Sequence, residues 1–463
     1  MDRRAAARFI IPVLAFALTL ALRVHGISRH FSLLGDQIRD WGIALGPFSE
    51  LPLVGPATHV GGYTIGPAFY WILWAIRVIV GPWFDNLPHG GGVGQAILQS
   101  GADAVLLVAI WSRTGSVWIG IAAIVLIATG PYDLALSALI WNPTMGQALA
   151  KIATALVLLG WPLRSLAGVA VTTAVAWSAV HAYTGAIFVT LGVFAAILGG
   201  LLFRGEYGRA ARSAAVIAIV VAVLQVPLIV YQFSNQAPAM GAVTGSVGRI
   251  LSGEAPPDLA GSWTAFAGAF TFIQGAPFTF TEGAPWDQQG WLVWVLAGCA
   301  ALVTVRHRHD PALLAVTVLP LVLTVIGYAF FLGHAHEAYY YLSLMPAAVL
   351  TIFLALPAVP SPKVAQAVAM SLAVAALAIG PARVRFASML QRMPEYGALV
   401  DGSRRLVERG FPVRAIRTDF PLHYTANREF IYRILGGRID PSSPVSALIA
   451  RDGQVTYQSE RSK

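Results

Sequence analysis

Charged residues and cysteines are scarce in this chain of 463 residues. Only 11% of the residues are charged and 57% are hydrophobic, whereas soluble domains carry about 25% charged residues. Such a sequence cannot present enough polar surface to water, which predicts a protein with many membrane spans. The single cysteine, Cys299, lies inside an apolar run. It excludes an internal disulfide framework and a CxxC metal site.

The motifs of several enzyme classes are also missing. The sequence has no Walker A loop, no GxSxG, no HExxH and no GxGxxG before a helix. These absences argue against an ATP-driven transporter, a serine hydrolase and a zincin. The net charge of +9 is common in membrane proteins with basic cytoplasmic loops, so it gives no reason to expect a nucleic-acid partner.

Eleven apolar runs predict full membrane crossings. They are 9–24, 93–111, 117–130, 145–160, 166–181, 186–203, 213–232, 290–305, 312–332, 339–357 and 364–380. Arginine and lysine gather in alternate loops, while the short loops 131–144, 182–185 and 333–338 of the opposite set contain neither. This asymmetry predicts a cytoplasmic N-terminus and an external C-terminal tail.

Two further apolar segments are predicted to lie at the membrane surface instead of crossing it. Segment 65–80 contains Arg77 and leads into HGGGVG, and it falls in a long external loop, 25–92. Segment 263–280 is short, aromatic and rich in glycine. Aromatic side chains favour the headgroup level, which suits interfacial or re-entrant helices.

The last part of the chain differs in kind. Residues 381–463 hold 14 Lys/Arg and 8 Asp/Glu and no run long enough to span a membrane. The pattern predicts a helix ending near 404–410, a strand at 413–417, a helix at 426–435, and a hairpin of 447–451 with 454–457 around Asp452-Gly453. The fold class is therefore a polytopic α-helical membrane domain, 1–380, of about 11 to 13 spans, with a small external α/β domain, 381–463.

Candidate site residues lie mainly in the external loops. Asp36 and Asp40 are four residues apart and share one face of a helix, with Arg39 near both. This arrangement suits a general base at the lipid–water boundary, and equally a solvated amphipathic helix. His59 and Tyr63, further along the same loop, are candidates to contact a phosphate or sugar; a structural histidine and an aromatic belt are the alternatives.

Later loops add a second group of candidates. Trp141 and Asp133 are expected to face an external cavity, and Asn142 before Pro143 is either a ligand or a helix N-cap. Lys151 lies inside an apolar run and could neutralise a lipid phosphate or snorkel to the interface.

The remaining candidates close two external loops. His181 ends the fifth crossing, and His334, His336, Glu337 and Tyr340 cluster in GHAHEAYYY. Their spacing matches no standard zinc site, so no metal or other cofactor is expected. Hydrogen bonds to a sugar or phosphate head group are the favoured role, and an interfacial tyrosine belt is the alternative.

Five motifs follow one another along the chain: GDQIRDWG, LPLVGPATHVGGYTIGPAFYW, IWNPT, WSAVHAYTGA and HEAYYYLSLMP. In this order they resemble the motifs of the GT-C superfamily of membrane glycosyltransferases. The pattern is most similar to the protein mannosyltransferase/aminoarabinose transferase group and its rhizobial galacturonosyltransferases. The resemblance implies inverting transfer of a sugar from a polyprenyl-phosphate donor to an envelope acceptor, such as lipid A or lipopolysaccharide, another glycolipid or a protein, on the periplasmic side of a bacterial inner membrane.

The resemblance also assigns roles to particular residues. It implies that Asp36 is the general base and that Asp40, the second acid of the DQxRD pattern, is catalytic with it, so that these two carboxylates carry the acid–base work. Many relatives have another acid in the second external loop, where this sequence has Asn142, which cannot act as a base. Two other hypotheses remain open: a transporter or flippase for a lipid-linked or anionic solute, although no inverted repeat is visible, and a non-catalytic partner of envelope polysaccharide enzymes.

Overall fold

The computed structural model of the chain describes residues 3–57, 65–235, 248, 252, 256–279, 292–331, 338–358, 361–378, 393, 395–420 and 428–459. Each of the eleven predicted crossings coincides with a helix. These helices are α1 (Arg3–Val24), α5 (Pro88–Thr114), α6 (Val117–Ala128), α8 (Asn142–Leu158), α9 (Leu166–Ala182), α10 (Ile187–Phe203), α11 (Tyr207–Ser234), α14 (Leu292–Arg306), α15 (Pro311–Phe331), η6–α16 (Ala338–Leu344 and Met345–Ala355) and α17 (Pro362–Ala378).

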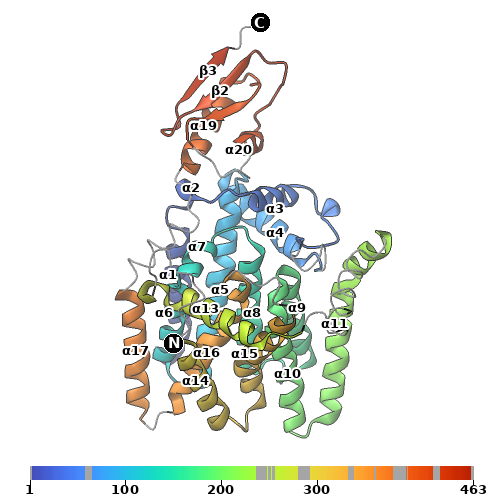
Figure 1. The fold of residues 1–463 in the computed structure, drawn as a ribbon, viewed down its shortest axis with the longest axis vertical. Coiled ribbons are helices and arrows are strands. Elements are labelled where there is room, and N and C mark those ends of the chain that lie inside the picture. The colour runs from blue at the N-terminus through green and yellow to red at the C-terminus, as the bar shows by residue number, and fades with distance from the viewer. Residues whose placement is uncertain are drawn as a thin grey trace.

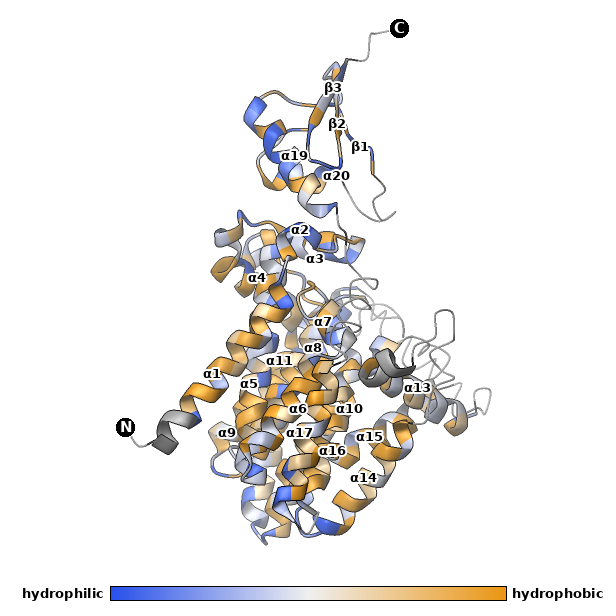
Figure 2. Ribbon diagram, turned by 90° about the vertical axis from the view of Figure 1, so that its left-hand side faces the viewer, coloured by the Kyte–Doolittle hydropathy of each residue, from blue (hydrophilic) through white to orange (hydrophobic). Residues whose placement is uncertain are grey.

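Six helical segments of the described part are long and apolar enough to cross a membrane. They are Arg8–His30, Pro88–Thr114, Thr184–Phe203, Tyr207–Ser234, Pro311–Phe330 and Ala338–Ala355. Hydrophobic residues predominate along the helices of the bundle, and hydrophilic residues gather at its lower end (Figure 2). Helix α11 stands at the periphery with its apolar side chains exposed, whereas α16 is buried at the centre (Figure 1). The polytopic helical fold class predicted from composition is therefore confirmed.

A layer of short helices caps one end of the bundle. It contains α2 (Ile27–His30), α3 (Gly35–Leu45), η1 (Phe48–Glu50), α4 (Ala68–Ile79), η2 (Gly81–Phe84) and α7 (Pro131–Leu136). Helix α4 has only 12 residues and lies beside α3 above the bundle (Figure 1). Helix α13 (Leu259–Thr279) also lies across the ends of its neighbours and is not among the six candidate spans (Figure 2).

The glycine-rich stretch HGGGVG was expected to belong to the loop 25–92, and this expectation is wrong. Helix α5 begins at Pro88, so these glycines form its first turns. Proline is favoured at the first position of a helix because its missing N–H needs no partner there. A Cβ on Gly91 would collide with Trp41 and Ile140 at 2.5–2.7 Å. The glycines therefore let α3 and the segment after α7 pack directly on α5.

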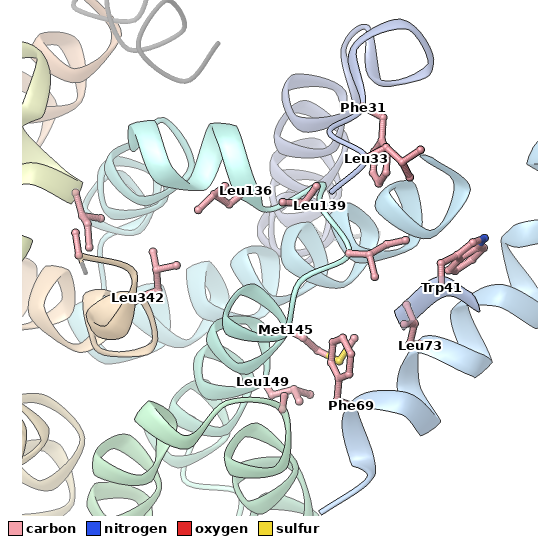
Figure 3. Close-up of a cluster of buried hydrophobic side chains, with 14 of the residues drawn as sticks. Phe31, Leu33, Trp41, Phe69, Leu73, Leu136, Leu139, Met145, Leu149 and Leu342 are labelled. Atoms are coloured by element: carbon pink, nitrogen blue, oxygen red, sulfur yellow. The ribbon is translucent and has the colours of Figure 1, made fainter. Parts of the chain in front are cut away.

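Apolar side chains join this capping layer to the bundle. Phe69 and Leu73 of α4 pack with Met145 and Leu149 of α8, and Trp41 of α3 lies in the same buried cluster (Figure 3). Each fully buried side chain of this size contributes about 1.5–3 kcal/mol. The capping layer is therefore fixed on the bundle by a continuous core.

The C-terminal residues form a small α/β unit beyond the capping layer (Figure 1). Its parts are α19 (Tyr396–Arg409), β1 (Ile416–Thr418), α20 (Arg428–Ile434), β2 (Val445–Ile449) and β3 (Val455–Ser459). Strand β2 pairs in parallel with β1 and antiparallel with β3. The predicted turn at Asp452-Gly453 is present, with Gly453 at φ 77°, although the strand limits differ from the predicted ones by two residues at several ends.

Three contacts dock this unit on the capping layer. The hydroxyl of Tyr396 lies 3.0 Å from Nδ1 of His89, and its ring packs against Phe31 with centroids 5.4 Å apart. Arg404 pairs with Asp85 at 2.6 Å.

A close helix crossing gives a first prediction. A Cβ at Gly192 of α10 would overlap the carbonyl oxygen of Ala315 and lie 2.8 Å from Cγ of Pro320 in α15, whereas at Gly199 the nearest atom, Pro311 Cβ, is 3.9 Å away. We expect Gly192→Ala to lower the free energy of unfolding by about 1–3 kcal/mol because the two helices must separate. Gly199→Ala should leave it unchanged. Unfolding midpoints in detergent compare the two, and equal effects would contradict this packing.

Candidate active site

The acidic helix α3 has one face in the protein and one in solvent. Gln37, Asp40, Trp41 and Ala44 are buried, while the Asp36 side chain is 55% exposed. Nε2 of Gln37 donates to the carbonyl oxygen of Ile140 at 3.0 Å, and Nε1 of Trp41 donates to that of Asn86 at 2.7 Å. These bonds fix how α3 is rotated on the bundle, with Asp36 outward.

Four side chains in the capping layer form a continuous polar chain. Nη1 of Arg39 lies 2.9 Å from Oδ1 of Asp36. Arg39 also donates to both oxygens of Asp40, from Nε at 2.8 Å and from Nη2 at 3.2 Å. The hydroxyl of Tyr70 in α4 donates to Oδ1 of Asp40 at 2.9 Å. Exposed Asp36 is thus held by Arg39, which is held by buried Asp40.

The charges in this chain are set by burial and by hydrogen bonds. Burial raises the pKa of Asp40, and the bonds from Arg39 and Tyr70 oppose that rise. The pKa of Arg39 is raised by Asp40, so the guanidinium stays protonated. Asp40 has no exposed surface and cannot reach a substrate, whereas Asp36 can. The two carboxylates were predicted to share one face of a helix, and both pair with Arg39 on α3. The catalytic role expected for Asp40 is corrected, because its carboxylate is buried while that of Asp36 is exposed.

Aromatic rings gather next to this polar chain. Trp141, which follows the carbonyl bonded by Gln37, packs on Tyr339 with ring centroids 5.0 Å apart. Tyr340 lies 4.7 Å from Tyr339 and stacks on Tyr183 at 6.5 Å. Two predicted site residues, Trp141 and Tyr340, are therefore brought into one aromatic cluster beside the start of α8, the end of α9 and η6.

His181 lies beneath the first external loop. It is 1% exposed, and a Cβ at Gly66 would fall inside van der Waals contact with its imidazole ring. The backbone N–H of Gly55 donates to the carbonyl oxygen of Ile65 at 2.9 Å. A Cβ at Gly55 would lie 3.1 Å from the carbonyl oxygen of His181. This histidine supports the loop in the described arrangement and is not open to solvent.

Lys151 is part of a buried cluster of four charges. Its Nζ lies 2.8 Å from Oδ1 of Asp103 and 3.3 Å from Oδ2 of Asp133, and it also donates to Gln99 at 2.9 Å. Arg23 of α1 pairs with the same two carboxylates and donates to Ser100 at 2.8 Å. The cluster is electrically neutral and joins α1, α5, α7 and α8.

This cluster corrects two expectations. Lys151 is 0% exposed and paired with two carboxylates, so it does not reach the membrane surface by snorkelling. Asp133 was expected to face an external cavity, but it is 4% exposed, because Arg23 and Lys151 draw it into the bundle. Asp103 of α5 pairs with Arg23 of α1 and Lys151 of α8, and Gln99 of α5 donates to Gln147 of α8 at 3.1 Å.

Asn142 has a different position from the expected N-cap. Helix α8 starts at Asn142 itself, the cap position falls on Trp141, and no side-chain cap bond forms. The first N–H groups of a helix have no partner within the helix and are often bonded by a cap side chain. Pro143 in the first turn of α8 has no N–H, so one fewer donor needs such a cap.

Five predicted site residues lie outside the described residues: His59, Tyr63, His334, His336 and Glu337. Among the residues that the structure describes, no group of three or more His, Cys, Asp or Glu side chains is arranged to hold a metal ion.

An apolar crevice opens between α13, α14 and α15. Its volume is about 290 Å³, and its walls include Trp263, Phe266, Leu296, Leu321 and Val325. Phe266 contacts Tyr341 with ring centroids 6.1 Å apart, next in sequence to Tyr340. One residue of the crevice wall, Phe266, is therefore in contact with the residue that follows Tyr340.

Sequence reasoning missed two parts of this site. Tyr70 was not among the predicted site residues, yet it is the second partner of Asp40. Arg23 was counted as part of an apolar crossing, yet it balances Asp103 and Asp133. The signal for Arg23 was present, because a charged residue inside a span requires a partner. For Tyr70 the sequence has no such signal.

Solved structures similar to this chain share its architecture. ArnT from Cupriavidus metallidurans bound to undecaprenyl phosphate matches with a TM-score of 0.54 and 13% identity, over 93% of this chain and 84% of ArnT. The apo form of ArnT matches with a TM-score of 0.54 over 96% and 93%. The oligosaccharyltransferase AglB from Archaeoglobus fulgidus, in complex with an inhibitory peptide and a dolichol-phosphate, has a TM-score of 0.46, with 13% identity over 93% of this chain and 64% of AglB.

No family model matches the chain, and no curated protein matches it in sequence. At 13% identity the likeness to ArnT establishes the fold. The predicted fold class, a polytopic helical domain with a small C-terminal α/β unit, is confirmed, and the fold is like that of ArnT.

The buried cluster gives a second prediction. Lys151→Met removes one of two cations and leaves Asp103 and Asp133 with a net negative charge in the bundle. We expect the free energy of unfolding to fall by about 3–5 kcal/mol, because an uncompensated buried charge is costly. The double variant Lys151→Met/Asp133→Asn is neutral again and should recover part of the loss. A loss no larger than that of Arg404→Gln, which breaks an exposed pair, would contradict this result.

Proposed function

We propose that this protein is a membrane glycosyltransferase that transfers a sugar from a polyprenyl-phosphate donor to an envelope acceptor. The observation that carries the proposal is the exposed Asp36 carboxylate, oriented by Arg39, Asp40 and Tyr70 on an ArnT-like fold. A base at this place sits where a lipid-anchored sugar and a water-facing hydroxyl can meet.

The reaction needs a base for the acceptor hydroxyl and a cation that stabilises the negative charge of the leaving phosphate. In our proposal Asp36 accepts the proton of the acceptor hydroxyl. The oxygen of that hydroxyl forms a bond to the anomeric carbon of the sugar at the same time. The bond from that carbon to the phosphate oxygen breaks, and polyprenyl phosphate leaves with the electron pair. A single displacement inverts the anomeric carbon. Asp40 touches no substrate and acts as a positioning residue for Arg39.

Arg39 is the cation best placed to stabilise the leaving phosphate. Its side chain is 47% exposed, and it is held about one helical turn from Asp36. A fixed charge next to developing negative charge is worth more than a mobile one, because no reorganisation is needed during the reaction. The Lys151 ammonium is already paired with two carboxylates, so we do not assign it this role.

The lipid tail of the donor requires an apolar path beside the site. The crevice between α13 and α15 is lined by aromatic and aliphatic side chains, and one of them, Phe266, contacts the residue that follows Tyr340. An undecaprenyl phosphate is bound in one structure of ArnT. We therefore propose this crevice as the place of the polyprenyl chain and the aromatic cluster as the contact surface for the sugar.

The proposed location is the bacterial inner membrane, with the N-terminus in the cytoplasm and the capping layer and C-terminal unit in the periplasm. The arginine-rich loops support this sidedness. Lipid A or lipopolysaccharide, another glycolipid or a protein would each present a hydroxyl on that side.

The base assignment gives a third prediction. We expect Asp36→Asn to lower the transfer rate by about 10²–10⁴-fold, the usual contribution of general acid–base catalysis, with unchanged expression. Glu50→Gln, in the same loop and also exposed, should keep full activity. Mass spectrometry of envelope lipids measures the transferred sugar, and normal transfer by Asp36→Asn would remove the catalytic assignment.

The Tyr70 hydrogen bond gives a fourth prediction, on pH dependence. The bond favours ionised Asp40 and lowers its pKa, so Tyr70→Phe raises that pKa. Protonated Asp40 has no charge to hold Arg39, and activity falls as pH drops through the pKa. We therefore expect the acidic limb of kcat/KM to move to higher pH in Tyr70→Phe, with the two proteins converging at high pH. Tyr207→Phe, exposed at the far end of the bundle, should not move the limb.

A further inference from the structure

The end of the bundle opposite α3 is strongly basic. The turns α5–α6, α8–α9, α10–α11 and α14–α15 meet there, and the start of α17 lies beside the start of α6. The cationic side chains of these turns and of the adjoining helix ends are Arg113, Arg164, Arg204, Arg209, Arg212, Arg306, Arg308 and Lys363, and the acidic ones are Glu206 and Asp310. Both acids are already paired, Glu206 with Arg209 at 3.1 Å and Asp310 with Arg113.

A cavity of about 320 Å³ opens between these turns. One part of its wall is apolar and is supplied by α8, α10 and α15, including Val157, Leu158, Phe203 and Leu313. The other part is polar and consists of Arg113, Arg204, His309 and Asp310. The cavity is therefore amphipathic, with its apolar wall along the helices and its polar wall at their ends.

The charges that line the cavity leave one cation in excess. Asp310 is occupied twice: one oxygen pairs with Arg113, and the other accepts the backbone N–H of Leu313 at 3.1 Å. Arg204 follows the last residue of α10 and is exposed. Within the described residues its side chain makes no ion pair. Its guanidinium is thus available at the mouth of the cavity.

We propose that this cavity binds an anionic phospholipid of the facing leaflet, with the lipid phosphate on Arg204 and the upper acyl chain on the apolar wall. The excess positive charge selects an anionic headgroup over a zwitterionic one, and basic pockets between helix ends are known to bind such lipids. The apolar wall selects a lipid over free phosphate. This site lies at the opposite end of the bundle from Asp36 and does not depend on the proposed function.

Titration of the delipidated full-length protein in detergent tests the proposal. Phosphatidylglycerol, phosphatidylcholine and inorganic phosphate are added separately, with the thermal unfolding midpoint and native mass spectrometry of retained lipid as readouts. We expect phosphatidylglycerol alone to raise the midpoint and to be retained. Arg204→Gln should weaken its apparent affinity about fivefold, the effect of one cation near a charged lipid surface, and Arg204→Lys should preserve it.

The matched control is Arg306→Gln, which removes the same charge at the same end but outside the cavity lining. An equal loss in Arg306→Gln would mean diffuse attraction to the whole face and would overturn the site. Equal stabilisation by phosphatidylcholine or by phosphate would overturn the choice of ligand. An Asp36→Asn protein should bind the lipid as the unmodified chain does, so this test is independent of sugar transfer.

Discussion

The buried cluster of Arg23, Asp103, Asp133 and Lys151 is the interaction on which the geometry of the capping layer depends. Its two cations and two carboxylates are buried together. The N···O distances are 2.6 Å for Arg23–Asp103, 2.8 Å for Lys151–Asp103 and 3.3 Å for Lys151–Asp133. Each of these charges requires its partners, because leaving one buried charge unpaired lowers the free energy of unfolding by about 3–5 kcal/mol. The cluster therefore permits only one arrangement of α1, α5, α7 and α8.

This constraint reaches the candidate base through the chain that follows α7. Asp133 holds α7 in place, and the segment after it presents the carbonyl of Ile140 to Gln37. Gln37 sets the rotation of α3, which places Asp36 in solvent and Asp40 against Tyr70. The glycines at the start of α5 let this segment lie directly on the bundle. The site is thus built on rigid helices through bonds that do not themselves touch substrate.

The two ends of the bundle have opposite chemical character. The capping end combines carboxylates, a held arginine and tyrosines beside an apolar crevice. The other end gathers arginines around an amphipathic cavity. A membrane protein can maintain such a difference because its apolar flank separates two aqueous surfaces. The proposed orientation in the membrane and the proposed anionic lipid site both rest on this distribution of charge.

The sequence by itself determined the helices, the fold class, the small α/β unit and the face shared by Asp36, Arg39 and Asp40. Apolar runs and i, i+3 and i, i+4 spacings depend only on the local backbone. The tertiary structure alone decided that Lys151 is paired, that Asp133 is buried, that His181 lies under Gly66 and that Tyr70 holds Asp40. These contacts join residues 18 to more than 100 positions apart, and they follow from how the helices pack, which no local pattern specifies.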